Sequence, residues 1–342
     1  MWNRTFCQPA LLLFSLAAAA FTTLPAQAAL FVSSFGSSSV LEYDETTGAF
    51  TKTFVSAGSG GLNGAAGLAF RPNGNLLVNS FATGSVLEYD GKTGEFINTF
   101  ATGGGLANPT GLLFAPNGNL LVADNKNGSI LEYDGNTGEF IKPFVPSGSG
   151  GLAAPVTLIF GQNGNLLVSS FANSTVLEYD SKTGEFIKPF VPSGSGGLNI
   201  AEGLRFAPNG NLLVSSLGTS SVLEYDGETG EFIKTFVPSG SGGLFSSSGL
   251  RISKDGNLLV SSFRSNQVLE FDGNTGEFIK VFASGGGLTN PTDLIFSSTP
   301  VPEPSSALGT LALGALGISW TLKLDLEKRR KKASLESERC LD

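Results

Sequence analysis

Short apolar stretches alternate with turns along most of the chain. The turns are rich in Gly, Asn, Asp, Pro and Ser, and the pattern runs from about residue 30 to residue 296. The tetrapeptide Leu-Glu-Tyr-Asp, with Phe for Tyr in the last copy, starts at Leu41, Leu87, Leu131, Leu177, Leu223 and Leu269. These starts lie 44 or 46 residues apart. A fixed period of this length indicates a repeat architecture.

One unit of the repeat predicts four short strands. We expect them at residues 203–206, 211–216, 222–225 and 232–237. Asn209-Gly210 between the first two is a hairpin turn signal. A Pro-Ser-Gly-Ser-Gly-Gly run at 238–243 then predicts a flexible crossover into the next unit. Four antiparallel strands in roughly 45 residues are typical of a β-propeller blade.

Counting the strands predicts a closed ring. Six first strands are expected to start near Gly67, Gly111, Thr157, Gly203, Gly249 and Asp293. Six second strands start near Leu30, Leu76, Leu120, Leu166, Leu212 and Leu258, so the repeat begins on a second strand and ends on a first strand. The last blade then combines one C-terminal strand with three N-terminal strands, a clasp that leaves no open sheet edge. We therefore expect an all-β fold over residues 29–298, a six-bladed propeller of four-stranded antiparallel blades.

The repeat resembles propellers of the NHL and gluconolactonase type. The resemblance rests on the pattern Pro-Asn-Gly-Asn-Leu-Leu-Val, then Val-Leu-Glu-Tyr-Asp, then Thr-Gly-Glu-Phe. It implies blade architecture strongly and function weakly, because such propellers include binding scaffolds as well as metal-dependent lactonases and lyases. The lyase branch uses a histidine, which this chain lacks.

The composition excludes several kinds of site. The chain contains no histidine, and its two cysteines, Cys7 and Cys340, lie near the ends. A metal site would therefore use oxygen ligands, as Ca²⁺ or Mg²⁺ prefers. Residues 29–300 hold 13 Lys/Arg and 23 Asp/Glu. This acidic balance argues against nucleic acid as a partner.

The N-terminal 28 residues have the features of a signal peptide. Arg4 precedes an apolar run at 10–21, and Ala26 and Ala28 form a small-x-small cleavage site. The alternative is a membrane anchor that stays attached, although the run is shorter than the ~20 residues that span a bilayer. We expect an exported chain that starts at Ala29.

The C-terminal region has three parts in a fixed order. A linker at 299–306 holds Pro302, Glu303 and Pro304, and an apolar stretch follows at 307–322. The basic cluster consists of Lys328, Arg329, Arg330, Lys331 and Lys332. We expect a hydrophobic helix with its basic flank over 307–332, attached to the membrane, and a tail at 333–342.

This arrangement resembles the PEP-CTERM sorting signal of bacterial surface proteins. The resemblance implies processing by an exosortase-type protease near Pro302-Glu303-Pro304. It also implies membrane anchoring through the C-terminus and delivery to the cell envelope or the extracellular matrix.

Most recurring polar residues have structural explanations. An Asp that precedes a Gly/Thr turn in every unit is typical of a residue that bonds its own backbone. The recurring Tyr is expected to pack between blades. The informative positions are those where one unit departs from the others, and three such departures are acidic: Glu202, Asp293 and Asp124.

The three acidic departures fall in alternate blades, on the expected face of the channel mouth. Their convergence there would form an oxygen-rich site for Ca²⁺ or Mg²⁺. Asn108, Asn199 and Asn290 in the crossovers would add ligands or contact a substrate.

Three functional hypotheses remain open from the sequence. The first is a non-enzymatic binding or scaffold protein of the envelope or exopolysaccharide matrix, since near-identical blades lack the asymmetry of an active site. The second is a lactonase-like hydrolase that uses a divalent metal held by Glu202 and Asp293. The third is a membrane-held sensor domain with a separate signalling partner.

Overall fold

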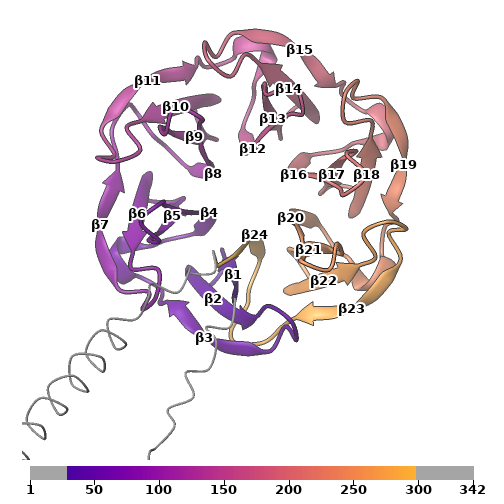
Figure 1. Ribbon diagram of the computed structural model, residues 1–342, viewed down its shortest axis with the longest axis horizontal. Coiled ribbons are helices and arrows are strands. Elements are labelled where there is room, and N and C mark those ends of the chain that lie inside the picture. The colour runs from indigo at the N-terminus through magenta and orange to yellow at the C-terminus, as the bar shows by residue number, and fades with distance from the viewer. Residues whose placement is uncertain (1–28, 298–342) are drawn as a thin grey trace, which may run out of the picture.

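The chain from residue 29 to residue 297 forms a ring of six four-stranded antiparallel sheets (Figure 1). This computed structural model describes residues 29–297. Each sheet is one blade, and its four strands lie side by side in order from the channel to the rim (Figure 1). The predicted fold class, a closed all-β propeller of six blades, is confirmed.

Five blades are continuous in sequence. Blade 1 contains β4 (Ala65–Phe70), β5 (Leu76–Ser80), β6 (Ser85–Tyr89) and β7 (Phe96–Ala101), and blade 2 contains β8 (Pro109–Phe114), β9 (Leu120–Asp124), β10 (Ser129–Tyr133) and β11 (Phe140–Val145). Blade 3 contains β12 (Pro155–Phe160), β13 (Leu166–Ser170), β14 (Thr175–Tyr179) and β15 (Phe186–Val191). Blade 4 contains β16 (Ala201–Phe206), β17 (Leu212–Ser216), β18 (Ser221–Tyr225) and β19 (Phe232–Val237), and blade 5 contains β20 (Ser247–Ile252), β21 (Leu258–Ser262), β22 (Gln267–Phe271) and β23 (Phe278–Ala283).

The sixth blade is the predicted clasp. Its order is β24 (Pro291–Phe296), β1 (Ala29–Ser34), β2 (Ser39–Asp44) and β3 (Phe50–Val55). β24 pairs antiparallel with β1, and beyond the strands Ser297 N–H donates to the Ala29 carbonyl at 2.8 Å. The ring is therefore sealed by hydrogen bonds between the two ends of the repeat region.

The inner strands begin two residues earlier than the sequence predicts. β16 starts at Ala201, where the pattern indicated Gly203, and β24 starts at Pro291, where it indicated Asp293. A bulge in each inner strand separates the first pair of partners from the rest, as between Ala201 and Leu204. The prediction started each inner strand at its short apolar stretch and so left out the first residues, which pair before the bulge.

The repeated motifs meet inside each blade, as blade 4 illustrates. The buried Glu224 of the Leu-Glu-Tyr-Asp motif accepts hydrogen bonds from the amides of Asn209 (2.9 Å) and Asn211 (2.7 Å). Lys234 on the outer strand lies 3.5 Å from its other oxygen. Asp226 accepts bonds from backbone N–H groups two and three residues ahead, as the turn interpretation predicted. Three separate sequence motifs thus form one polar network.

The crossovers are bound to the blades by aromatic residues. Tyr225 is fully buried, and its hydroxyl donates to the Ser195 carbonyl at 2.8 Å. Phe232 packs edge-on against Tyr225, with ring centroids 5.7 Å apart, and covers Gly196. A Cβ at Gly196 would lie 2.1 Å from the Phe232 ring, so the chain needs glycine there.

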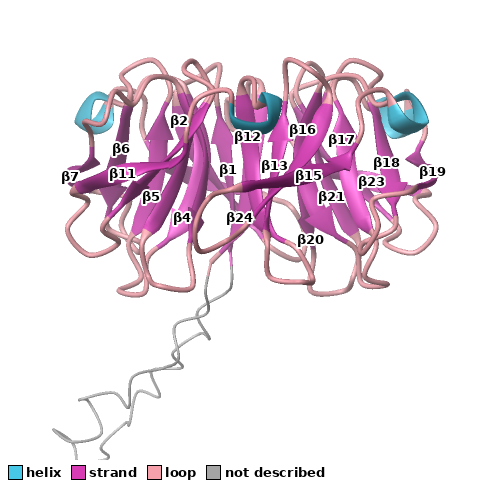
Figure 2. Cartoon of the chain, turned by 90° about the horizontal axis from the view of Figure 1, so that it is seen from above, coloured by secondary structure: helices cyan, strands magenta, loops and turns pink. Residues whose placement is uncertain are grey.

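The crossovers and the chain ends lie on opposite faces of the ring. Short 3₁₀ turns mark four of the crossovers, η1 (Ser59–Gly61), η2 (Ser149–Gly151), η3 (Ser195–Gly197) and η4 (Ser241–Gly243). They lie on one face, called the crossover face below (Figure 2). β1 starts and β24 ends on the other face. Ala29 and Ser297 are therefore at the far end of the channel from the crossovers.

Candidate functional site

A cavity of about 460 Å³ occupies the channel and opens toward the crossover face. Its rim is formed by the residue that follows the second strand of each blade. We call this set the mouth ring; it consists of Phe35, Phe81, Asn125, Phe171, Leu217 and Phe263. Each of these residues donates its N–H to a crossover carbonyl 2.9–3.3 Å away. The mouth ring is thus mostly aromatic and is fixed to the crossovers.

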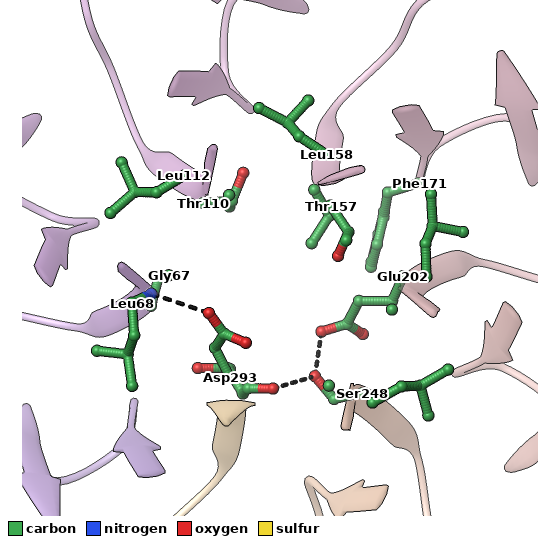
Figure 3. Close-up of a pocket in the computed structure, with 18 of the residues that line it drawn as sticks. Gly67, Leu68, Thr110, Leu112, Thr157, Leu158, Phe171, Glu202, Ser248 and Asp293 are labelled. Carbon is green, nitrogen blue, oxygen red and sulfur yellow. Dashed lines mark hydrogen bonds between the residues drawn. The ribbon is translucent and has the colours of Figure 1, made fainter. Parts of the chain in front are cut away.

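The cavity wall carries its charged groups on one side, and the side formed by blades 2 and 3 is largely apolar apart from Thr110 and Thr157 (Figure 3). Leu112, Leu158 and Ile159 of blades 2 and 3 contribute apolar side chains. Figure 3 shows Asp293, Ser248 and Glu202 next to one another, with Leu112 and Leu158 across from them. The asymmetry comes from residues that differ between otherwise similar blades.

Glu202 is a buried carboxylic acid on β16, with 8% of its surface exposed. Ser248 of the next inner strand donates a hydrogen bond to Glu202 Oε1, while Oε2 has no partner within residues 29–297. Burial raises the pKa of Glu202 to about 7, and the bond from Ser248 opposes this rise. The group is therefore divided between acid and carboxylate near neutral pH.

Asp293 is held by the backbone on both sides. Its Oδ2 accepts the N–H of Leu68 at 2.8 Å, and its Oδ1 accepts the N–H of Leu294 at 2.8 Å. Burial raises the pKa of Asp293, while these bonds and the charges of Arg251 and Arg205 oppose the rise. Asp293 thus links blade 6 to blade 1 at the cavity wall.

Arg205 and Arg251 complete the polar side, and sequence reasoning missed both. They occupy the same position on the neighbouring strands β16 and β20 and line the cavity. Within residues 29–297 neither guanidinium forms a hydrogen bond or a close ion pair, and Asp293 is the opposite charge that acts on both. Burial and the like charge of Arg251 together lower the pKa of Arg205 to about 10, and the charge of Asp293 opposes this change.

These arginines could have been identified in the same way as the acidic residues, because each departs from the residue that other blades carry at that position. The four other inner strands carry Ala69, Leu113, Ile159 and Ile295 at this position. An arginine there replaces an apolar residue in a strand that otherwise reads as core. The sequence interpretation considered acidic departures only and therefore did not consider this position.

Asp124 lies outside this cavity. It ends β9, where most other blades carry a serine that bonds to the crossover. Its Oδ2 accepts the amide of Asn127 at 2.8 Å, and its neighbours are Gly104, Ser129 and Ser147. Burial raises the pKa of Asp124, and the bonds from Asn127 oppose the rise. The structure therefore brings together two of the three predicted metal ligands and separates the third.

No group of three or more acidic or cysteine side chains within residues 29–297 is arranged to hold a metal ion. The crossover asparagines have other partners as well. The amides of Asn108 and Asn290 donate to the carbonyls of Phe81 and Phe263, 2.9 and 3.0 Å away. Asn199 donates its N–H to the Ser216 hydroxyl. These three residues therefore fix the mouth ring and the crossovers.

The predicted terminal signals lie outside residues 29–297. These are the cleavage site at Ala26 and Ala28, Pro302-Glu303-Pro304, the hydrophobic helix over 307–332 and its basic cluster. Within the residues that the structure describes, no helix is long and apolar enough to cross a membrane.

Comparisons with known proteins identify one motif and the fold. Residues 300–323 match the family described as the PEP-CTERM protein-sorting motif. A search of curated protein sequences finds no match. The fold is similar to a solved structure titled "Crystal structure of Nidogen/Laminin Complex", with a TM-score of 0.65 and 16% identity over 80% of this chain and 99% of that one.

A protein of unknown function from Bacteroides caccae is also similar, with a TM-score of 0.60 and 16% identity over 80% of this chain and 100% of that one. At such identity the likeness establishes the propeller fold and no activity. The sorting motif implies export, membrane-associated sorting to the surface and recognition by an exosortase. The chain is therefore a six-bladed β-propeller that carries a PEP-CTERM sorting motif at residues 300–323.

Proposed function

We propose that this protein is a surface-displayed, non-enzymatic binding module of the cell envelope or its exopolysaccharide matrix. The observation that carries the proposal is the position of the chain end relative to the cavity. Ser297 lies on the face opposite the mouth ring, and the sorting motif begins at residue 300. Attachment through this end leaves the mouth ring directed away from the point of attachment.

The distribution of differences between blades supports binding at the cavity. In every blade the Glu of the third strand has polar or charged partners on neighbouring strands or turns, whereas the inner strands differ in charge and size. Both carboxylate oxygens of Asp293 accept backbone N–H groups, and Glu202 accepts a hydrogen bond from Ser248 through one of its two oxygens. Concave, largely apolar pockets with a few polar groups are the usual form of a small-ligand site.

The test is binding of the exported protein to fragments of the producing cell's envelope, measured by co-sedimentation. The variant Phe171→Asn/Phe263→Asn replaces two mouth-ring side chains by the residue that Asn125 already places in that ring. We expect it to bind about tenfold more weakly or worse. The control Ile233→Thr changes an exposed rim residue to the one that Thr51 supplies in blade 6. Equal binding by both variants, or no binding by the unmodified protein, would contradict the proposal.

Removal of metal separates this proposal from the metal-dependent hydrolase. The two guanidinium groups beside Asp293 repel a cation, so we expect EDTA to leave envelope binding and the melting temperature unchanged. Binding that is lost in EDTA and restored by Ca²⁺ or Mg²⁺ would instead favour the divalent-metal hypothesis. Lactone hydrolysis that is abolished by Glu202→Gln would do the same.

A further inference from the structure

We infer that the cavity binds a small molecule with one carboxylate and an apolar body, and that Arg205 and Arg251 hold the carboxylate. This inference rests on the proposed function and names the ligand class of the same cavity. Its basis is the combination of an unpaired guanidinium pair, an apolar wall and a mostly aromatic rim.

The arginine pair carries the argument for an anion. Arg205 and Arg251 come from equivalent positions of β16 and β20, close enough for one charge to act on the other. Within residues 29–297 their donors are not used by hydrogen bonds. A guanidinium group presents parallel N–H donors that match a carboxylate. Two such groups on one wall of the cavity offer more N–H donors than a single carboxylate needs.

The charges around the pair indicate a single negative charge on the ligand. Asp293 offsets one guanidinium, but both of its oxygens are already bonded to backbone N–H groups. Glu202 is partly protonated near neutral pH and adds less than one further negative charge. Arg264 also lines the cavity, where it stacks on Phe245, so the net charge of the cavity is between one and two positive charges. This positive balance suits an anion, and the acidic groups beside the arginines favour a single negative charge over the two of a dianion such as sulfate.

The remaining walls indicate an apolar body. Leu112, Leu158 and Ile159 face the polar side across the cavity. Phe171 and Phe263 of the mouth ring are half-buried at its opening. A volume of about 460 Å³ falls in the range of ordinary small-molecule sites. A ligand would place its carboxylate on the arginines and its apolar part against the leucines or the ring of phenylalanines.

The experiment is calorimetric titration of the exported protein at pH 6 with three probes. They are 4-phenylbutyrate, its neutral counterpart 4-phenyl-1-butanol, and inorganic sulfate as the dianion. We expect the carboxylate to bind about tenfold or more tightly than the alcohol, because only the carboxylate accepts the guanidinium bonds. Equal binding of acid and alcohol, tighter binding of sulfate than of the acid, or no binding of the acid would each overturn the inference.

Variants assign the effect to the two arginines. Arg205→Met and Arg251→Met should each weaken 4-phenylbutyrate binding about tenfold or more. Lys254→Met removes a positive charge that pairs with Glu45 outside the cavity, and it should leave the affinity unchanged. Equal loss in all three variants would show a general charge effect and overturn the inference. The comparison of acid and alcohol on the unmodified protein holds even if an arginine variant fails to fold.

The outcomes also separate this inference from the proposed function. Envelope binding that depends on Phe171 and Phe263, with no binding of the carboxylate, would end this inference and leave the proposed function standing. Carboxylate binding without envelope binding would contradict the envelope role and leave the cavity assignment intact.

Discussion

Single residues that differ between blades give the cavity its chemistry. Glu202 and Ser248 occupy equivalent positions on neighbouring inner strands, and together they form a hydrogen bond that no other pair of blades forms within residues 29–297. Arg205 and Arg251 place charge where four other blades are apolar. Such groups are costly to bury, so they reduce the stability of a ring that the repeat alone would close.

Glu202 makes the stability of the ring depend on pH. Its pKa rises from 4.5 to about 7 on folding, so the folded state holds the proton more tightly than the unfolded state. The contribution of the Glu202 proton to stability is therefore full below pH 4.5 and is lost as the pH rises through about 7. Glu202→Gln keeps a hydrogen-bond acceptor for Ser248 and removes the charge.

We expect Glu202→Gln to be more stable than the unmodified protein at pH 8 by up to about 3 kcal/mol, and nearly equal to it at pH 4.5. Urea unfolding at the two pH values measures the difference. Asp293 titrates in both proteins, so its contribution cancels. A stability difference that is the same at both pH values would contradict the burial of an ionisable Glu202.

The sequence placed Glu202 and Asp293 at the channel, and both line the cavity, while their role as metal ligands stays a prediction. Glu202 and Asp293 were found because each replaces a small residue on an inner strand. Asp124 was misplaced because the end of a second strand contacts the crossover and not the channel. Arg205 and Arg251 were missed because the sequence interpretation considered only acidic departures from the repeat.

At the scale of the element, the repeated motifs of a blade contact one another, and these contacts give each motif its structural role. The Asn amides of the first turn, the Glu of the third strand and the Lys of the fourth strand meet in one network. Their spacing in the sequence predicted turns and strands but not this meeting, because the Glu read as an ordinary strand residue. One glycine of each crossover has an equally local explanation, because a phenylalanine ring covers it.

The covering phenylalanine predicts different costs for two adjacent glycines. Gly196 has a φ of 61° and lies beneath Phe232, whereas Gly197 has a φ of 87° with open space around it. Both alanine variants carry the strain of a left-handed backbone, roughly 1–2 kcal/mol. Gly196→Ala also displaces the ring.

We expect Gly196→Ala to lower the free energy of unfolding by about 1 kcal/mol or more beyond Gly197→Ala. Denaturant unfolding of the two variants measures the difference. Equal losses would show that the contact between Phe232 and the crossover contributes nothing to stability.

At the scale of the whole molecule, the clasp turns a linear repeat into a ring. The sequence predicted this closure from the strand count alone, because the repeat begins and ends at complementary strands. β24 covers the inner edge of β1 and carries Asp293 into the cavity. Loss of β24 would therefore expose a strand edge and remove part of the cavity wall.

Two truncations test the clasp. A chain that ends at Ser297 keeps every strand of the ring, and we expect it to melt cooperatively at the temperature of the full-length protein. A chain that ends at Asn290 lacks β24, and we expect it to aggregate or to lose cooperative melting. Near-ultraviolet circular dichroism follows both. Identical melting of the two chains would contradict the role assigned to the clasp.

The most direct test of the whole account is a crystal structure of the protein soaked with 4-phenylbutyrate. The account predicts a carboxylate within hydrogen-bonding distance of Arg205 and Arg251, and a phenyl ring against the apolar wall or the mouth ring. An empty cavity, or a ligand bound only at the rim of the propeller, would contradict the assignment of this cavity as the binding site.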